Sequence, residues 1–438
     1  MTILAAVVVL GILVFVHELG HFLVAKRSGV GVLKFSLGFG PKLIGVKRGE
    51  TEYLLSALPL GGYVKMIGED PSDPSPEAAD PERSFSQKGV GTRARIILAG
   101  PLANFVLPVL IFWSIFTFVG QPYFLPIVGT PEPGSPAAQA DLRAGDRVQE
   151  LGGARIERWS EVEAAVQASS GRELTLTIAR DGRTFVVRLA PRAVATRDIF
   201  GQETQAWDVG LHPLLSTRIG QVLTGHVAEQ AGLRSGDSIV ALNGNPVAEW
   251  EHLAKFIHGS PGKSIRLTVE REGRRFGVEV TPRLGEQGVG LIGIGPAPES
   301  RYQRLNPVTA LVSGAKETAR LSVVIAQGFI KLIQGRISPT TIGGPILITQ
   351  VAGEAVQRGP VQALQLTAFL SINLAILNLL PIPILDGGHL LFSLIEWLRG
   401  TPVSLRKREI AQQVGLVLLV GLMVFAFYND IFRLFGRP

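Results

Sequence analysis

Residues 3–25 read ILAAVVVLGILVFVHELGHFLVA, an apolar stretch that carries His17, Glu18 and His21 near its far end. Its length matches the ~20 residues that a helix needs to cross the hydrocarbon core of a bilayer. An ionisable side chain at that depth is disfavoured by roughly 2.5 kcal/mol or more, so several of them close together need a partner. A metal ion is the partner that these side chains indicate.

The spacing of His17 and His21 suits a metal site on one face of a helix. At about 3.6 residues per turn, positions i and i+4 point the same way, so both imidazoles can bind one ion. Glu18 lies about 100° round the helix from His17. From there it can act on a water molecule as a general base without binding the metal, as in the HExxH pattern of zinc proteases. The alternative is a chance pentapeptide or a polar helix end, which would leave unpaired polar groups in an apolar helix.

Composition indicates a mixed membrane and soluble chain. The 438 residues are 46% hydrophobic, with a mean hydropathy of +0.29. The net charge is +7, but basic residues are scattered among acids and no basic run alternates with aromatics, which argues against nucleic-acid binding. The absence of cysteine excludes disulfides, thiolate zinc ligands and cysteine nucleophiles. Any metal must therefore be held by His, Asp or Glu.

Three further stretches, about 95–119, 364–385 and 411–429, are long and apolar enough to span a membrane. Lysines and arginines are concentrated between the first two spans and between the last two. By the positive-inside rule these two loops are cytoplasmic. We therefore expect the long segment from about 120 to 360, together with both termini, on the exterior side.

This topology places three polar motifs at one depth. His17 lies roughly 21 Å into the first span, nearer the cytoplasmic side. Residues 100–104 (GPLAN) open the second span, and residues 378–388 (NLLPIPILDGG) close the third. Asp386 then becomes the natural third metal ligand, although an Asp before Gly-Gly can also be a simple capping residue. Three protein ligands with an open fourth position are typical of a catalytic zinc site.

The asparagines and prolines near these motifs have weaker signals. Pro381 and Pro383 should break the helix where Asp386 must turn inward. Asn378 is a candidate donor to an oxyanion or to the substrate backbone, but it could also bond to neighbouring backbone. We expect Asn104 to act mainly in packing.

HELGH, GPLAN and NLLPIPILDGG, in this order, resemble the site-2 protease family of intramembrane zinc metalloproteases, specifically the bacterial regulator of sigma-E protease type. The resemblance covers essentially the whole chain. It implies a multi-pass protein of the bacterial inner membrane, with one Zn²⁺ bound by His17, His21 and Asp386 and with Glu18 as the base. It also implies regulated intramembrane proteolysis of single-span membrane proteins, such as an anti-sigma factor or remnant signal peptides.

The exterior segment repeats itself without gaps. AAQADLRAGD at 137–146 returns as AEQAGLRSGD at 228–237, and Trp159 returns as Trp250. Short alternating strands with Gly turns, and the LRxGD signature, look like circularly permuted bacterial PDZ domains. Such domains bind extended chains by strand addition. The alternative is a spacer or size filter that excludes bulky ectodomains, and the family resemblance favours the filter.

Residues 33–66 predict a re-entrant β-hairpin beside the metal. The stretch LLSALPLGGYVKM at 54–66 is too apolar for a free loop and too short to span. An edge strand there could hold a substrate extended, which matters because a helical backbone hides its carbonyls from attack. Gly61–Met66 match the family's re-entrant loop, although an ordinary hairpin packed on the helices is the alternative. The candidate substrate-binding residues in this stretch are Gly62, Tyr63, Val64, Lys65 and Met66.

The expected fold is a multi-pass helical membrane protein with four transmembrane helices, a membrane-associated β-hairpin and two tandem α+β PDZ domains between helices two and three. A helix at 310–334, interrupted by charges, should lie on the membrane surface, and the acidic segment 69–82 should be a flexible loop. Two other functions stay open: a membrane-anchored PDZ receptor with a structural zinc, and metal transport. The expected parts are 1–120 (first part of the membrane core), 126–193 and 218–284 (PDZ domains), 300–360 (amphipathic surface segment) and 361–438 (second part of the core).

Overall fold

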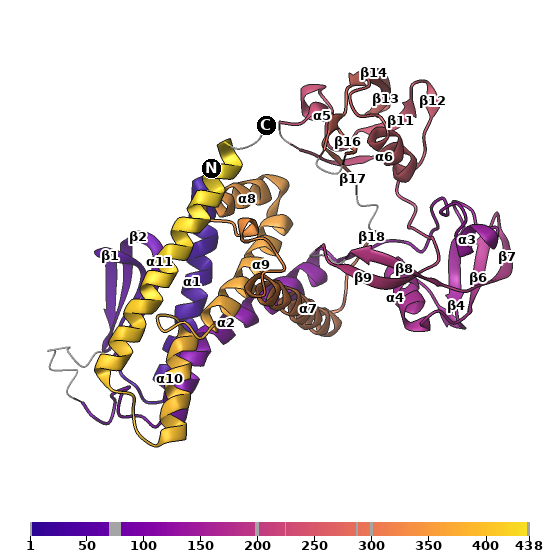
Figure 1. Cartoon of the computed structure of the whole chain (residues 1–438). Coiled ribbons are helices and arrows are strands. Elements are labelled where there is room, and N and C mark those ends of the chain that lie inside the picture. The colour runs from indigo at the N-terminus through magenta and orange to yellow at the C-terminus, as the bar shows by residue number, and fades with distance from the viewer. Residues whose placement is uncertain are drawn as a thin grey trace. The chain divides into compact units, whose positions relative to one another are not determined.

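A computed structural model of the chain describes residues 2–69, 80–197, 201–223, 225–285, 288–297 and 301–435. Most of the predicted loop 69–82 lies outside these ranges. The chain divides into two compact units (Figure 1), one made of Met1–Gly120 with Arg304–Pro438 and the other of Gln121–Gln303. The first unit is helical with one hairpin, and the second consists of short strands and helices.

Four helices are long and apolar enough to cross a membrane: α1 (Thr2–Arg27), α2 (Val90–Phe118), α9 (Pro360–Asn378) and α11 (Leu405–Phe435). They correspond to the four stretches predicted from the sequence. The third prediction, 364–385, extends too far, because α9 ends at Asn378. Pro381 and Pro383 follow at once, and proline cannot continue the hydrogen-bonding pattern of a helix.

Small residues let α1 and α2 approach closely. A β-carbon at Gly20 would come within 2.3 Å of the Ala99 carbonyl oxygen, so only glycine allows this contact. The α9 helix is joined to α2 by a buried hydrogen bond that Ser371 Oγ donates to the Asn104 carbonyl oxygen at 2.8 Å. These contacts fix three of the four long helices to one another.

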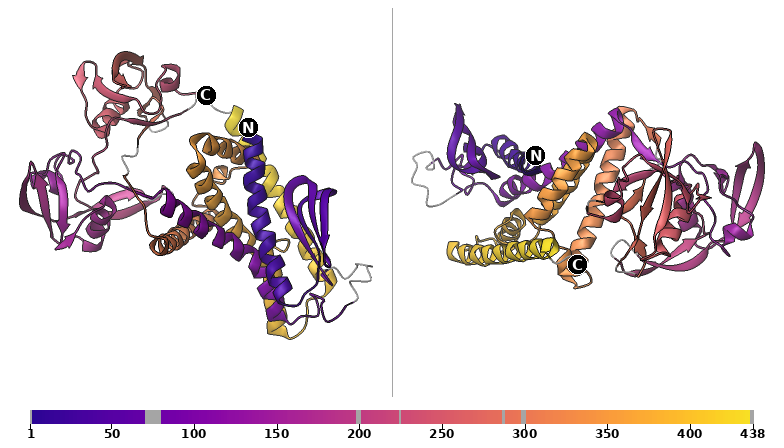
Figure 2. Two further views of the ribbon diagram at one scale, coloured as in Figure 1. Left: turned by 180° about the vertical axis from the view of Figure 1, so that it is seen from behind. Right: turned by 90° about the horizontal axis from the view of Figure 1, so that it is seen from above.

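The predicted hairpin is present as β1 (Val32–Arg48) and β2 (Thr51–Met66), which run along one side of α1 (Figure 2). Residues 34–37 of β1 pair with residues 52–55 of β2 and again with residues 62–65. The segment 62–66 therefore forms an edge of this small sheet. Leu43, Ile44 and Val46 are 63–65% exposed, as suits a hairpin that contacts lipid.

Three further helices complete this unit: α7 (Pro307–Ile333), α8 (Pro345–Arg358) and α10 (Asp386–Arg399), with a short 3-10 turn, η2 (Pro339–Thr341). The α7 helix packs against α2. A loop was predicted between the third and fourth spans, and this was wrong for residues 386–399, which form α10. The side chain of Asp430 on α11 caps the start of α8 by accepting from the Gly344, Ile346 and Leu347 amides.

The second unit contains two repeats of one architecture, each a four-stranded sheet with two helices. The strand orders are β5-β4-β6-β7 and β12-β11-β13-β14. The first repeat comprises α3 (Pro136–Gln139), β4 (Arg147–Leu151), β5 (Ala154–Arg155), α4 (Trp159–Ser169), β6 (Leu174–Arg180) and β7 (Arg183–Leu189). The second comprises α5 (Val227–Gln230), β11 (Ser238–Leu242), β12 (Asn245–Pro246), α6 (Trp250–His258), β13 (Ile265–Arg271) and β14 (Arg274–Val280).

Shorter strands connect and flank the repeats. A hairpin of β8 (Arg192–Arg197) and β9 (Glu203–Asp208) follows the first repeat, and the much shorter β15 (Arg283–Leu284) and β16 (Gly290–Leu291) follow the second. β10 (Ile219–Val222) pairs with β17 (Ile294–Pro296). At the ends of the unit, β3 (Gln121–Tyr123) pairs with β18 (Arg301–Gln303), so the chain enters and leaves it side by side.

Candidate metal centre

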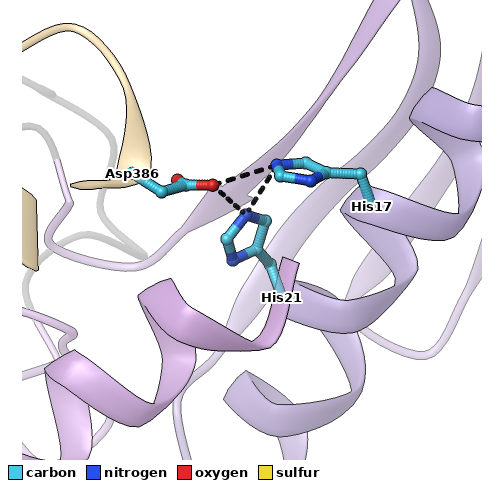
Figure 3. Close-up of side chains that lie close together, drawn as sticks. All are labelled: His17, His21 and Asp386. Atoms are coloured by element: carbon cyan, nitrogen blue, oxygen red, sulfur yellow. Dashed lines mark hydrogen bonds and ion pairs between the residues drawn. The ribbon is translucent and has the colours of Figure 1, made fainter. Parts of the chain in front are cut away.

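The α1 helix presents His17 and His21 on one face, one turn apart. Their Nε2 atoms lie 3.2 Å from each other, and the two residues are only 8% and 9% exposed. In Figure 3 both rings point to the same spot, where Asp386 enters from the opposite side. The i and i+4 spacing thus gives the convergence that the sequence predicted.

Asp386 is the first residue of α10. Its Oδ2 atom lies 3.1 Å from His17 Nε2 and 3.5 Å from His21 Nε2. The two glycines that follow allow this approach, because a β-carbon at Gly387 or Gly388 would come within 2.2–2.3 Å of the backbone oxygens of Leu380 or Ile382. The loop after α9 therefore folds tightly onto the start of α10 and directs the carboxylate inward.

The three facing atoms fit a zinc ion. The two Nε2 atoms and Asp386 Oδ2 form a triangle with sides of 3.1, 3.2 and 3.5 Å. In tetrahedral zinc sites the bonds are about 2.0–2.1 Å, so ligand atoms lie about 3.3 Å apart. Asp386 Oδ2 is also buried without a hydrogen-bond partner among the described residues. Such an oxygen, aimed at two imidazole nitrogens, is the arrangement expected of a cation ligand.

Hydrogen bonds behind the two imidazoles orient them. His21 Nδ1 lies 2.8 Å from the Ile96 carbonyl oxygen, to which it can only donate, so its Nε2 lone pair is free for a metal. His17 Nδ1 lies 3.4 Å from the side-chain amides of both Asn104 and Asn378. The Asn104 Oδ1 atom has no partner in the described structure, and amide oxygen and nitrogen are assigned from such networks. Turning this amide lets Oδ1 accept from His17 Nδ1, which frees His17 Nε2 as well.

Two residues of the second span lie closer to the metal centre than the sequence indicated. Asn104 was expected to act mainly in packing, yet it is fully buried with its amide against His17. Gly100 was not singled out, and a β-carbon there would come within 2.2 Å of His21 Nε2. The close approach of α2 to the two histidines depends on this glycine. The quoted GPLAN motif was the available signal.

Glu18 lies beside the edge segment of β2. A β-carbon at Gly62 would come within 3.0 Å of Glu18 Cγ and 2.8 Å of the Ser36 carbonyl oxygen. The Tyr63 ring stacks on Phe39 with centroids 6.2 Å apart. The structure therefore brings this part of the hairpin, tightly packed, to the predicted base.

The other candidate residues of the hairpin differ in their surroundings. Val64 and Met66 are both 7% exposed and belong to a core cluster with Ala25 and Phe35. Any contact of these two with a substrate would have to be made by backbone atoms. Lys65 lies opposite Lys34 in the strand register.

The chain is similar to known proteins over nearly its whole length. The profile of Peptidase family M50 matches residues 5–422. The regulator of sigma-E protease RseP of Salmonella typhimurium is 35% identical over 98% of this chain and 98% of its own length, and the protein of that name from Escherichia coli K12 shows the same values. A protein of Neisseria meningitidis serogroup A that carries a zinc metalloprotease name is 36% identical over 99% of this chain and 100% of its own length.

Among solved structures, a PDZ domain from Listeria monocytogenes aligns with 19% of this chain and 85% of its own length. The sequence identity is 18% and the TM-score is 0.17. The two repeats nevertheless share one strand order and one sequence signature with each other.

Proposed function

The chain belongs to peptidase family M50 and is a metalloprotease, and from this premise we propose that it is an intramembrane zinc endopeptidase that cleaves the spanning segments of single-span membrane proteins. The observation that supports this most is the triangle of His17, His21 and Asp386. Its corners come from two helices far apart in the sequence, and it forms within a helical unit that is apolar enough to span the membrane.

In this proposal His17, His21 and Asp386 hold one zinc ion. When bound, zinc supplies Lewis-acid activation of a water molecule and of the scissile carbonyl. The carboxylate of Glu18 accepts the proton from the attacking water and passes it to the nitrogen of the leaving amine. Three converging protein ligands among the described residues favour a catalytic site over the structural zinc of a membrane receptor, which would have four.

The substrate would bind in an extended form along the edge segment 62–66. Helical backbone satisfies its hydrogen bonds internally, so a spanning helix must unwind before a carbonyl can be attacked. Two features support this position: residues 34–37 pair on one side of the segment, and Gly62 lies against Glu18. The amide of Asn378, next to His17, is placed to donate to the substrate backbone.

The chain is a multi-pass inner-membrane protein. Within that location we place the metal centre near the cytoplasmic side and the two repeats, with both termini, in the periplasm. We assign residues 126–193 and 218–284 as tandem PDZ domains and 300–360 as an amphipathic surface segment. The membrane core comprises 1–120 and 361–438.

Relatives that are called regulator of sigma-E protease support an anti-sigma factor as the substrate, and remnant signal peptides would suit the same site.

The repeats could exclude bulky ectodomains or dock a peptide, and one contact favours exclusion for the first repeat. From α4, Gln167 Nε2 donates to the Trp207 carbonyl oxygen at 2.7 Å, and its Oε1 accepts from the Trp207 amide at 3.1 Å. These bonds occupy the backbone positions that an added strand would use on this side of β9.

The Glu18→Gln variant tests the proposal. The purified full chain in lipid nanodiscs would be incubated with single-span peptides, and the products would be sequenced by mass spectrometry. We expect zinc content to stay at the wild-type level and cleavage to stop, because the amide cannot accept a proton. Turnover by Glu18→Gln, or cleavage by wild-type protein that a zinc chelator does not reduce, would contradict the proposal.

A further inference from the structure

A buried charge cluster lies where α2 meets α10, away from the metal centre. Arg93 on α2 donates from a terminal guanidinium nitrogen to Glu396 Oε1 on α10 at 2.6 Å, and both side chains are only 11% exposed. Arg408, near the start of α11, lies 3.4 Å from the other Glu396 oxygen and packs over the Phe392 ring. Arg93 also donates from Nε to the Lys88 carbonyl oxygen at 3.0 Å.

Both helices that meet at this cluster also contribute to the metal centre. The Arg93 side chain is one turn before Ile96, whose carbonyl oxygen orients His21. Glu396 follows Asp386 by ten residues on α10, or about 15 Å along the helix axis. The α2 helix is the main packing partner of α10. The way α10 lies on α2 therefore contributes, together with the tight loop before Asp386, to the position of Asp386 relative to the histidines.

The cluster supplies a directional contact in the C-terminal half of α10, far from Asp386. The large apolar side chains Leu394, Trp397 and Leu398 in this half are 50–69% exposed, so they contribute little packing that would fix the helix on a neighbour. A guanidinium group, by contrast, donates in a fixed planar fork and so determines orientation. A buried ion pair adds little net stability compared with apolar packing, which makes a positional role a better account of its presence than stability.

We propose that Arg93 and Glu396 are positioning residues, which hold α10 on α2 so that Asp386 Oδ2 faces the Nε2 atoms of His17 and His21. This inference rests on the proposed metal-binding role of Asp386. Arg408 acts as a secondary partner, because its contact with Glu396 is longer and its Nε atom is buried without an acceptor among the described residues.

Metal binding by the Glu396→Gln variant tests this role directly. Zinc affinity would be measured by competition with a chromophoric chelator, using the purified full chain in nanodiscs. We expect the affinity to fall about 10-fold or more, as is typical when a group that orients a ligand is removed. We also expect the visible spectrum of the Co²⁺-substituted protein to change, because a displaced Asp386 alters the coordination geometry.

Companion variants separate positioning from a general loss of folding. Arg93→Lys keeps the charge but not the fork and should lose less affinity than Arg93→Gln. The double variant with Arg93→Gln and Glu396→Gln should be no worse than either single change, because both remove the same contact. Glu317→Gln removes an equal charge from the ion pair with Arg320 on α7 and should leave zinc affinity unchanged.

A measurement on the metal-free protein tests the same idea without zinc. The chain has no cysteine, so spin labels can be attached at Arg95→Cys on α2 and Leu398→Cys on α10. The distance distribution between them should broaden when Glu396→Gln is added. Wild-type zinc affinity, cobalt spectrum and label distances in Glu396→Gln would overturn the proposal. If Asp386→Ala also kept wild-type zinc affinity, the ligand assignment itself would fail; if Asp386→Ala lost zinc, only the positioning role would fail.

Discussion

Two aspartates, one in each unit of this chain, have opposite surroundings. In the first repeat, Asp146 accepts from Arg180 at 2.6 and 2.7 Å and from the Arg143 amide at 2.8 Å, so both its oxygens are satisfied by donors. In the metal centre, Asp386 Oδ2 faces two imidazole nitrogens and has no hydrogen-bond partner among the described residues. A saturated carboxylate stabilises a fold, whereas one aimed at nitrogen lone pairs is arranged for a cation.

The sharpest test of this contrast is Asp386→Asn. We expect the rate of cleavage to fall by roughly three orders of magnitude or more, because a neutral amide is a poor zinc ligand. Loss of the zinc ion removes the activation of the attacking water. The metal-free variant should unfold at the same temperature as the metal-free wild type or higher, because a charged oxygen that is buried without a hydrogen-bond donor is costly. Peptide cleavage, zinc content and thermal unfolding of the stripped protein would be measured. A variant that unfolded at a lower temperature but kept its zinc would show that Asp386, like Asp146, serves to stabilise the fold.

The Gly100→Ala variant tests how tightly α2 packs against the metal centre. Its β-carbon would come within 2.2 Å of His21 Nε2, so the ring or α2 must shift. We expect zinc affinity to fall about 10-fold to 100-fold, in line with the loss of a group that orients a ligand. Gly11→Ala on α1 is a matched control, because nothing lies within 4 Å of its added carbon. Equal zinc affinity in the two variants would show that α2 does not restrain His21.

In the first repeat, the Asp146→Asn variant should lose stability but keep zinc and activity, which is the reverse of the result expected for Asp386→Asn. Removing the charge weakens the bonds from Arg180 while the site stays buried, which costs about 2 kcal/mol of folding free energy. Zinc content and the cleavage of a peptide without an ectodomain should not change. Hydrogen exchange of peptides from β4 and β6, followed by mass spectrometry, would locate the loss. Unchanged exchange in both strands would contradict a structural role for this aspartate.

The sequence could indicate those parts of the centre that depend on local spacing. The histidine pair is one helical turn, and Asp386 stands in a recognisable motif after two prolines. The roles of Gly100 and Asn104 depend on how α2 crosses α1, which no periodicity within one segment reveals. The α10 helix was expected as a loop because its exposed Leu394 and Trp397 and its nearby charges do not form a spanning pattern. Likewise, most of the long β8–β9 hairpin lies outside the repeated sequence, which was expected to end at residue 193.

The smallest expected effect concerns acid and the second repeat, where Asp237 occupies the place of Asp146. Burial raises the pKa of the Asp237 carboxyl, but the Arg271 guanidinium and the Arg234 amide outweigh it and hold the pKa below the usual value. A carboxyl with a lowered pKa in the folded state stabilises fully above its unfolded value of about 3.9, and this contribution is lost as the pH falls through the folded pKa.

Pepsin cleavage within residues 225–285 should therefore accelerate below about pH 4. In Asp237→Asn, cleavage should be faster than in the wild type above about pH 4 and should approach the wild-type rate in stronger acid, so that it depends less on pH. The exposed Asp141→Asn should match the wild type. A variant and a wild type with parallel acid profiles would mean that Asp237 does not couple folding to protonation, and the contrast with Asp386 would then rest on Asp146 alone.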